Sequence, residues 1–217
     1  FGGHFHNDNS ITALRDIPGL VVGCPSRGDD AVEMLRTLAA MAHVDGRVCV
    51  LLEPIALYMH KDLHEPGDGQ WCFPYPAPGT ALVPGQGRVY APEATDLVVF
   101  TFGNGVPMSL RVARRLQREH GLQVRVVDLR WLVPLDAGFI AAQAVSARRV
   151  LVVDEGRRSG GVGEGVLTAL LEAGLGHLPM ARVAGADTYT PLAGAAMFGL
   201  PSDNGVLSAA LALARET

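Results

Sequence analysis

The sequence predicts an α/β protein of three layers, in which a mainly parallel sheet lies between helices. First, short continuous apolar runs alternate with amphipathic stretches along most of the 217 residues. Continuous apolar runs are typical of strands that are covered on both faces. Second, glycine, proline and polar residues separate these segments, as expected of turns. Third, 48% of the residues are hydrophobic and 18% are charged, so the chain can bury a sizeable core.

The first block, up to about residue 60, has the pattern strand, helix, strand. Its strands are the apolar runs 20–24 and 48–52. Between them, Ser26 or Asp29 can cap a helix whose apolar residues recur every three to four positions. These positions are Ala31, Met34, Leu35, Leu38, Met41 and Ala42. The block therefore predicts a βαβ unit with two parallel strands, both covered on both faces.

The periodicity is lost between about residues 60 and 95, where prolines and glycines are frequent. We expect a linker or surface excursion here, with one short hairpin around 81–90. The aromatic residues Trp71, Phe73 and Tyr75 indicate that it packs against the rest of the protein.

The alternation returns at residue 96 and continues to the C-terminus. Strands are expected at 97–102, 124–127, 150–153 and 180–183, and helices at 106–120, 135–145, 163–173 and within 202–215. Gly121 and Gly174 follow two of these helices and supply left-handed stops. The arginines of 106–120 are spaced as a solvated face. This order predicts a mainly parallel sheet between helices.

Charge and cysteine content exclude several classes of protein. The net charge is −4 and there is no basic run, which argues against a nucleic-acid partner. No segment reaches the roughly 18 uninterrupted apolar residues of a membrane helix. The three cysteines are few, widely spaced and odd in number, which favours the reducing cytoplasm over a disulfide framework.

The densest polar cluster lies at residues 4–10, beside a double glycine. One interpretation is a metal site, in which His4, His6 and Asp8 are joined by His60 and His64. A second is a solvated turn, because Asn and Asp favour turns for local reasons. A third is a histidine that faces a substrate. The residues alone leave these interpretations open.

Two glycine-rich turns stand where a strand gives way to a helix, a place where phosphates often bind. In 103–105 the third glycine of a dinucleotide fingerprint is missing, because Met108 takes its place. In 160–163 no Lys-Ser or Lys-Thr follows, so this is no phosphate-binding loop of the P-loop kind. We therefore expect a tight turn and a close helix contact.

Two ordered sets of short motifs run through nearly the whole chain. The first comprises 5–10, 16–22, 25–26, 30–31, 52–54 and 57–58, and the second 96–99, 102–103, 127–130, 134–136, 152–156, 160–164 and 185–188. The first set resembles the end of the pyrimidine-binding domain in β subunits of thiamine-diphosphate-dependent 2-oxo acid dehydrogenases, of the pyruvate and branched-chain types. The second resembles their transketolase-like C-terminal domain. The resemblance implies a truncated pyrimidine-binding domain at 1–60, a linker at 61–95 and a C-terminal domain at 96–217.

The resemblance also implies roles for individual residues. His6 matches the family's active-site histidine, which lies near the cofactor and the 2-oxo acid and can transfer protons during decarboxylation and acyl transfer to lipoyl-lysine. The family usually has Ser-Gln after this histidine, whereas this chain has Asn7 and Asp8. Asp45, with Ala42 nearby, matches a potassium site of the family, but Arg47 replaces an expected small amide there.

Thiamine diphosphate and magnesium are implied for the full assembly. The glutamate that contacts the aminopyrimidine would precede residue 1, and the metal-binding residues would belong to an α part. The chain alone is therefore expected to be inactive and to bind no cofactor. The implied partners are an α subunit or α-like region, a second β copy and the subunit-binding domain of a lipoyl acyltransferase.

Other functions remain open. A transketolase or a deoxyxylulose-phosphate synthase would share the C-terminal domain. A non-catalytic module could only dimerise and dock a partner. A nucleotide-binding oxidoreductase is disfavoured by the incomplete glycine pattern. The identity of the 2-oxo acid does not follow from these residues.

Overall fold

The structure is a computed structural model, and it describes residues 2–8 and 10–215. It confirms the α/β architecture with a five-stranded sheet in the order β3-β5-β4-β7-β8. These strands are β3 (Arg88–Tyr90), β4 (Leu97–Thr101), β5 (Val124–Asp128), β7 (Val150–Arg157) and β8 (Met180–Gly185). All neighbours pair in parallel except β3, which runs antiparallel to β5.

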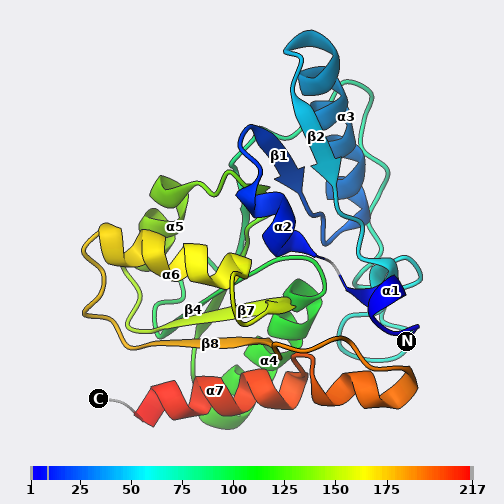
Figure 1. The fold of residues 1–217 in the computed structure, drawn as a ribbon. Coiled ribbons are helices and arrows are strands. Elements are labelled where there is room, and N and C mark those ends of the chain that lie inside the picture. The colour runs from blue at the N-terminus through cyan, green and yellow to red at the C-terminus, as the bar shows by residue number, and fades with distance from the viewer. Residues whose placement is uncertain (1, 9, 216–217) are drawn as a thin grey trace.

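Helices cover both faces of this sheet, which gives the expected three layers (Figure 1). On one face lie α4 (Gly105–His120) and α7 (Asp203–Arg215), and on the other α5 (Ala137–Ala144) and α6 (Val162–Glu172). Side chains of a strand alternate between faces, so Val98 and Phe100 join the core under α5 and α6, whereas Leu97 and Val99 join the other. The sheet is thus buried on both sides, as its apolar strands predict.

The first block forms a smaller unit beside this sheet. It contains α1 (His4–Asn7), α2 (Ile11–Asp16), β1 (Leu20–Gly23), α3 (Gly28–Val44) and β2 (Val48–Leu51). β1 and β2 are parallel, which confirms the βαβ unit. A strand that was not expected, β6 (Trp131–Val133), pairs antiparallel with β1, so the sheet has the order β2-β1-β6. The polypeptide from the larger part therefore completes the smaller sheet.

Three expectations for the first block were wrong in detail. β2 is not covered on both faces, since it lies at the edge of the sheet and Val48 is 64% exposed. Neither expected side chain caps α3, whose first residue follows Arg27. Ser26 Oγ instead donates to Asp128, and Asp29 forms an ion pair with Arg27. The buried face of α3 consists of Asp30, Met34, Thr37 and Leu38, while Leu35 faces outward.

The segment 61–95 has no hairpin. Its one strand, β3, pairs with the distant β5, because the edge of the large sheet offers more hydrogen-bond partners than a local turn. The aromatic residues pack as expected in two cases of three. Trp71 is buried and its Nε1 donates to Ser26 O at 3.1 Å, and the Arg27 guanidinium lies 3.7 Å from the centre of the Phe73 ring. Tyr75 is exposed.

Short 3₁₀ helices complete the chain, namely η1 (Ile55–Leu57) and η2 (Ala193–Phe198). Across the described ranges 2–8 and 10–215, no helix combines the length and the hydropathy that crossing a membrane requires.

The smaller unit covers the carboxyl edge of the large sheet, where parallel strands of α/β proteins usually present their binding residues. Gly103, just after β4, shows how close the contact is. A Cβ atom at this position would lie 3.2 Å from both Cys24 Sγ and Pro54 Cγ. The candidate site therefore lies where the two parts meet.

Candidate functional site

His6 lies on the exposed turn formed by α1. The backbone N–H groups of His6 and Asn7 both donate to Gly3 O, at 3.1 and 3.0 Å. Gly3 has a φ of 76°, in the left-handed region that favours glycine. A Cβ atom at Gly2 would lie 2.5 Å from the His6 ring, so the ring can fold over the backbone only because this residue is glycine. The double glycine thus shapes the turn that presents the imidazole.

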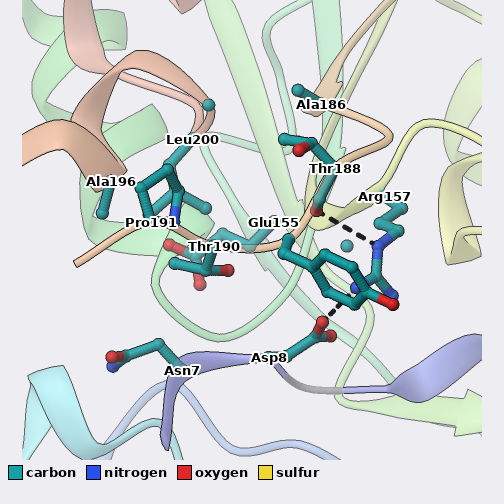
Figure 2. A pocket seen from close by; sticks show the side chains of 14 residues that line it. Asn7, Asp8, Glu155, Arg157, Ala186, Thr188, Thr190, Pro191, Ala196 and Leu200 are labelled. Atoms are coloured by element: carbon teal, nitrogen blue, oxygen red, sulfur yellow. Dashed lines mark hydrogen bonds and ion pairs between the residues drawn. The ribbon is translucent and has the colours of Figure 1, made fainter. Parts of the chain in front are cut away.

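Several contacts tie this turn to the loop that follows β8. Gly2 forms a β-bridge with Leu192, and the His4 ring lies 4.7 Å from the Tyr189 ring. The Asp8 carboxylate pairs with Arg157, whose Nε also donates to Thr188 O at 3.4 Å. Figure 2 shows the Arg157 side chain between these two partners.

Asn7 and Asp8 therefore have structural roles. The Asn7 side-chain oxygen accepts a hydrogen bond from Gly2 N at 2.7 Å, which closes the turn on itself. Asp8 attaches it to Arg157. The positions at which this chain departs from the expected Ser-Gln pair are thus the ones that hold the turn in place.

A small cavity lies between the turn and the carboxyl edge of the sheet (Figure 2). Its volume is about 30 Å³, which is room for one or two water molecules. Its walls are formed by Asn7, Asp8, Glu155, Gly156, Arg157, Gly185, Ala186, Thr188, Tyr189, Thr190, Pro191, Ala196, Gly199 and Leu200. His6 is not part of this lining; its ring packs against the backbone of Gly2 and the residue is exposed.

Glu155 lines this cavity from near the carboxyl end of β7. Asn104, which follows β4, donates from Nδ2 to its carboxylate at 2.7 Å. Burial raises the pKa of Glu155 to about 7, and the charge of Asp154 adds to the rise. The pair stands where the strand order changes direction, because β5 lies on one side of β4 and β7 on the other. Binding groups of α/β proteins are commonly found at such a position.

A second buried carboxyl, Asp128, ends β5. It accepts hydrogen bonds from Ser26 Oγ and from the backbone N–H of Arg130 at 3.2 Å. Burial raises its pKa to about 7, although its hydrogen bonds and the Arg130 charge act in the opposite direction. Asp128 thus joins the large sheet to the start of α3.

Asp30 on α3 is fully buried and binds two arginines of the larger part. Arg130 donates to its two oxygens at 2.7 and 3.0 Å, and Arg88 donates to the same two oxygens at 2.8 and 3.4 Å. Arg130 itself is 4% exposed. These ion pairs fix α3 against β3 and against the segment after β5.

The carboxyls at this junction were not singled out as site residues from the sequence. A signal was present, because Asp128, Asp154 and Glu155 follow or end apolar strands, and the motifs that contain them were recognised. Charged residues at the ends of buried strands often mark a ligand site or a domain contact. Here they lie in a contact between the two parts.

The metal interpretation of the histidines was wrong within the part of the chain that the structure describes, where no three His, Cys, Asp or Glu side chains gather at a possible metal site. His60 packs against Trp71, with ring centres 6.3 Å apart, whereas His4 lies against Tyr189. Asp45 and Ala42 are exposed at the end of α3, and nearby the Met41 carbonyl accepts the backbone N–H groups of Asp45 and Arg47.

Both glycine turns serve packing, as expected. At Gly105 a Cβ atom would lie 2.0 Å from Thr101 Oγ1, so the turn after β4 must be tight. At the start of α6 the Asp154 carboxylate accepts hydrogen bonds from Gly156 N and Gly163 N, both at 2.7 Å. An internal carboxylate thus takes the place that a phosphate would need.

The cavity beside the His6 turn is too small to hold thiamine diphosphate by itself. The cavity beside the His6 turn has a volume of about 30 Å³, far less than the 300–1,000 Å³ that is typical of sites for such molecules.

Comparisons with known proteins agree with this geometry. The family model described as "Transketolase, C-terminal domain" matches residues 85–204. A solved structure titled "Split gene transketolase, inactive beta4 tetramer" has a TM-score of 0.72 and 22% identity, and the match covers 94% of this chain and 60% of that one. The fold is therefore the same over nearly the whole chain.

Two curated relatives are similar in sequence. The pyruvate dehydrogenase E1 component subunit beta of Staphylococcus aureus is 32% identical over 217 residues, covering 97% of this chain and 62% of the relative. The 1-deoxy-D-xylulose-5-phosphate synthase of Chlorobium phaeovibrioides is 32% identical over 168 residues, covering 77% of this chain and 24% of the relative. The chain thus spans 24% of the synthase and 62% of the dehydrogenase subunit, and the resemblance seen in its motifs is confirmed.

Proposed function

Since the chain belongs to the family of transketolase C-terminal domains, we propose that it is the β-like part of a thiamine-diphosphate-dependent 2-oxo acid dehydrogenase component. This component decarboxylates a 2-oxo acid and passes the acyl group to lipoyl-lysine. In the proposal, residues 1–60 end a pyrimidine-binding domain, 61–95 form the linker, and 96–217 form the C-terminal domain.

The observation that carries the proposal is the extent of similarity to the pyruvate dehydrogenase subunit, which covers 97% of the chain. The match to the synthase covers only 77%. The greater extent of the match to the dehydrogenase subunit supports a dehydrogenase of the β-subunit type.

His6 is the proposed catalytic residue. Its imidazole is exposed on a turn whose backbone is held by Gly3, and an imidazole can give or take a proton near neutral pH. The described residues leave the outer side of the ring open. The remaining walls of the active site, with thiamine diphosphate and magnesium, would come from other polypeptide of the assembly.

The proposed partners are an α subunit or α-like region, a second β copy and the subunit-binding domain of a lipoyl acyltransferase. The chain alone is then inactive. Its three cysteines are free, which fits assembly in the reducing cytoplasm.

A non-catalytic dimerisation or docking module is the second candidate. Large apolar side chains are exposed around the His6 turn, where a partner could cover them. They are Phe5, Tyr189, Leu192 and Phe198, with exposures of 88%, 69%, 69% and 94%. A synthase or transketolase relative is the third, because its identity of 32% equals that of the dehydrogenase subunit.

The test is to produce the full-length protein with its α partner and to measure decarboxylation of pyruvate and branched-chain 2-oxo acids. Thiamine-diphosphate- and magnesium-dependent turnover, with acylation of a lipoyl domain, is expected. His6→Ala should lower acyl transfer by about 10²–10⁴-fold. His43→Ala, an exposed histidine on α3, is the matched control and should keep full activity.

Full acyl transfer by His6→Ala would refute the role of His6. An intact assembly that binds the lipoyl acyltransferase but decarboxylates no 2-oxo acid would favour the docking module. Carbon–carbon bond formation from pyruvate and a sugar phosphate, without lipoyl acylation, would favour the synthase.

A further inference from the structure

We propose that Arg157 is a positioning residue, which holds the turn carrying His6 against the C-terminal sheet. The functional consequence rests on the proposed role of His6, whereas the positioning itself rests on the contacts of the chain. Asp8 and Arg157 lie 149 positions apart in the sequence, and their ion pair is the charged contact between the turn and the sheet.

The first argument is that the turn cannot hold its own orientation. α1 has four residues, none of them buried, and no side chain caps its first residue. Helices this short are not stable by themselves in water, because nucleation fixes several residues for one hydrogen bond. Contacts outside the turn must therefore contribute to fixing the direction of the His6 ring.

The second argument concerns the base from which Arg157 acts. Arg157 is the last residue of β7, and its backbone is paired with Gly185 of β8. The loop that follows β8 is fixed by Ser159, whose N and Oγ donate to Asp187 at 2.8 and 2.6 Å. The guanidinium therefore extends from backbone that is fixed by its pairing with β8 and by the contact between Ser159 and Asp187.

The third argument is the geometry of the guanidinium, which bridges two segments. It donates to the Asp8 carboxylate through Nη2 and to Thr188 O through Nε (Figure 2). Asp8 is 17% exposed and Arg157 is 35% exposed at the side chain, so the pair is partly shielded from water. Hydrogen bonds between charged groups are about twice as strong as neutral ones.

The other contacts between the turn and this loop carry no charge. They are the Gly2–Leu192 bridge and the His4–Tyr189 ring contact. Both involve residues before His6, whereas Asp8 lies after it. Beyond Asp8 the chain is next anchored at Ile11, which is buried in the core under α5 and α6. Without Arg157 the turn would keep these uncharged anchors but lose its ion pair with the sheet, so the imidazole would be held less firmly.

Nuclear magnetic resonance relaxation of the chain tests the positioning without any catalysis. In the wild type, the amide order parameters of His6 and Asn7 should be about 0.85, as in rigid backbone, and Arg157→Ala or Asp8→Asn should lower them below about 0.6. Arg158→Ala is the matched control, because in the described residues Arg158 contributes its backbone N–H, which donates to Gly185 O, and no side-chain hydrogen bond.

Reversal of the pair sharpens this test. Asp8→Arg alone should also mobilise the turn, and the double variant Asp8→Arg with Arg157→Asp should restore the order parameters. Unchanged order parameters in Arg157→Ala would overturn the proposal, even if the assembly proves to be a dehydrogenase.

The catalytic consequence is measured in the full assembly. Arg157→Ala should lower kcat for acyl transfer about tenfold with little change in KM for the 2-oxo acid, and Arg157→Lys should recover part of the loss. Wild-type kcat in Arg157→Ala would overturn the positioning role. If the turn is mobilised but the wild-type assembly has no decarboxylase activity, the positioning holds and the proposed function alone fails.

Discussion

The two parts of the molecule differ in how they are stabilised. The five-stranded sheet lies between two cores, one under α5 and α6 and one under α4 and α7. The smaller β2-β1-β6 unit has a separate core of four described buried residues, Val21, Met34, Leu38 and Trp131, of which Trp131 belongs to β6. The larger part can bury its own apolar surface, whereas the smaller unit depends on its neighbour.

The side chains on the two faces of β1 show how the smaller unit depends on the larger part. Val21 faces the small core, whereas Leu20 and Val22 belong to the core that is shared with α5 and α6. On the far side, β2 leaves its edge unpaired and Val48 exposed. The contact between the two parts, with Asp30 and Asp128, therefore contributes much of the stability of the first block.

The largest effect should come from Asp30→Ala. This change leaves Arg130 buried without its carboxylate, and the loss of one partner of a buried ion pair costs about 3–5 kcal/mol. Urea unfolding should show a loss of about 4 kcal/mol in the free energy of unfolding. Asp29→Ala is the control, because its ion pair with Arg27 keeps 15% and 18% side-chain exposure and its loss should cost clearly less than that of Asp30. Equal losses in both variants would contradict the role of the buried contact.

The next effect should come from the small core. Met34 is fully buried, and Met34→Ala should cost about 3 kcal/mol through lost burial and a cavity. Hydrogen exchange should rise in β1 and β2 but not in β4 and β7, because the smaller unit opens locally. The adjacent Leu35 is 54% exposed, so Leu35→Ala should change stability by no more than about 0.5 kcal/mol. Uniform exchange in all four strands would show that the two parts unfold as one.

The free energy of unfolding should also depend on pH, in the range where the buried carboxyls Asp128 and Glu155 titrate. Burial raises the pKa of Asp128 and of Glu155 to about 7, above that of the unfolded chain. Their contribution to stability is therefore complete below about pH 4 and is lost as pH rises toward 7 and above. Between the pKa of the unfolded chain and the raised pKa of the folded chain, each of the two carboxyls lowers the free energy of unfolding by up to about 1.4 kcal/mol per pH unit.

Urea unfolding between pH 5 and 8 measures this slope. Asp29, Asp62, Asp68 and Asp187 have lowered pKa values and titrate below that range. Burial lowers the pKa of His60 and His64 and raises the pKa of Asp154, so these three groups also contribute to the curve, and the comparison with the variants isolates Asp128 and Glu155. Asp128→Asn and Glu155→Gln should each flatten the curve. A slope that persists in the double variant would show that other groups cause it.

The larger part was predicted well from sequence because its signals are local. Continuous apolar runs marked β4, β5, β7 and β8, and Gly121 ends α4 with a φ of 69°, as its position predicted. The helix cap at Ser26 was predicted wrongly, because the hydroxyl found a distant partner in Asp128. Local propensity could not include that partner.

The sequence by itself determined the type and order of most elements. Only the tertiary structure decided that β6 completes the smaller sheet, that β3 joins the larger one, and that Asp8 meets Arg157. The physical reason is distance along the chain. Periodicity and turn propensity act over a few residues, whereas the partner of a buried carboxyl or an edge strand is selected by packing between segments up to 149 positions apart.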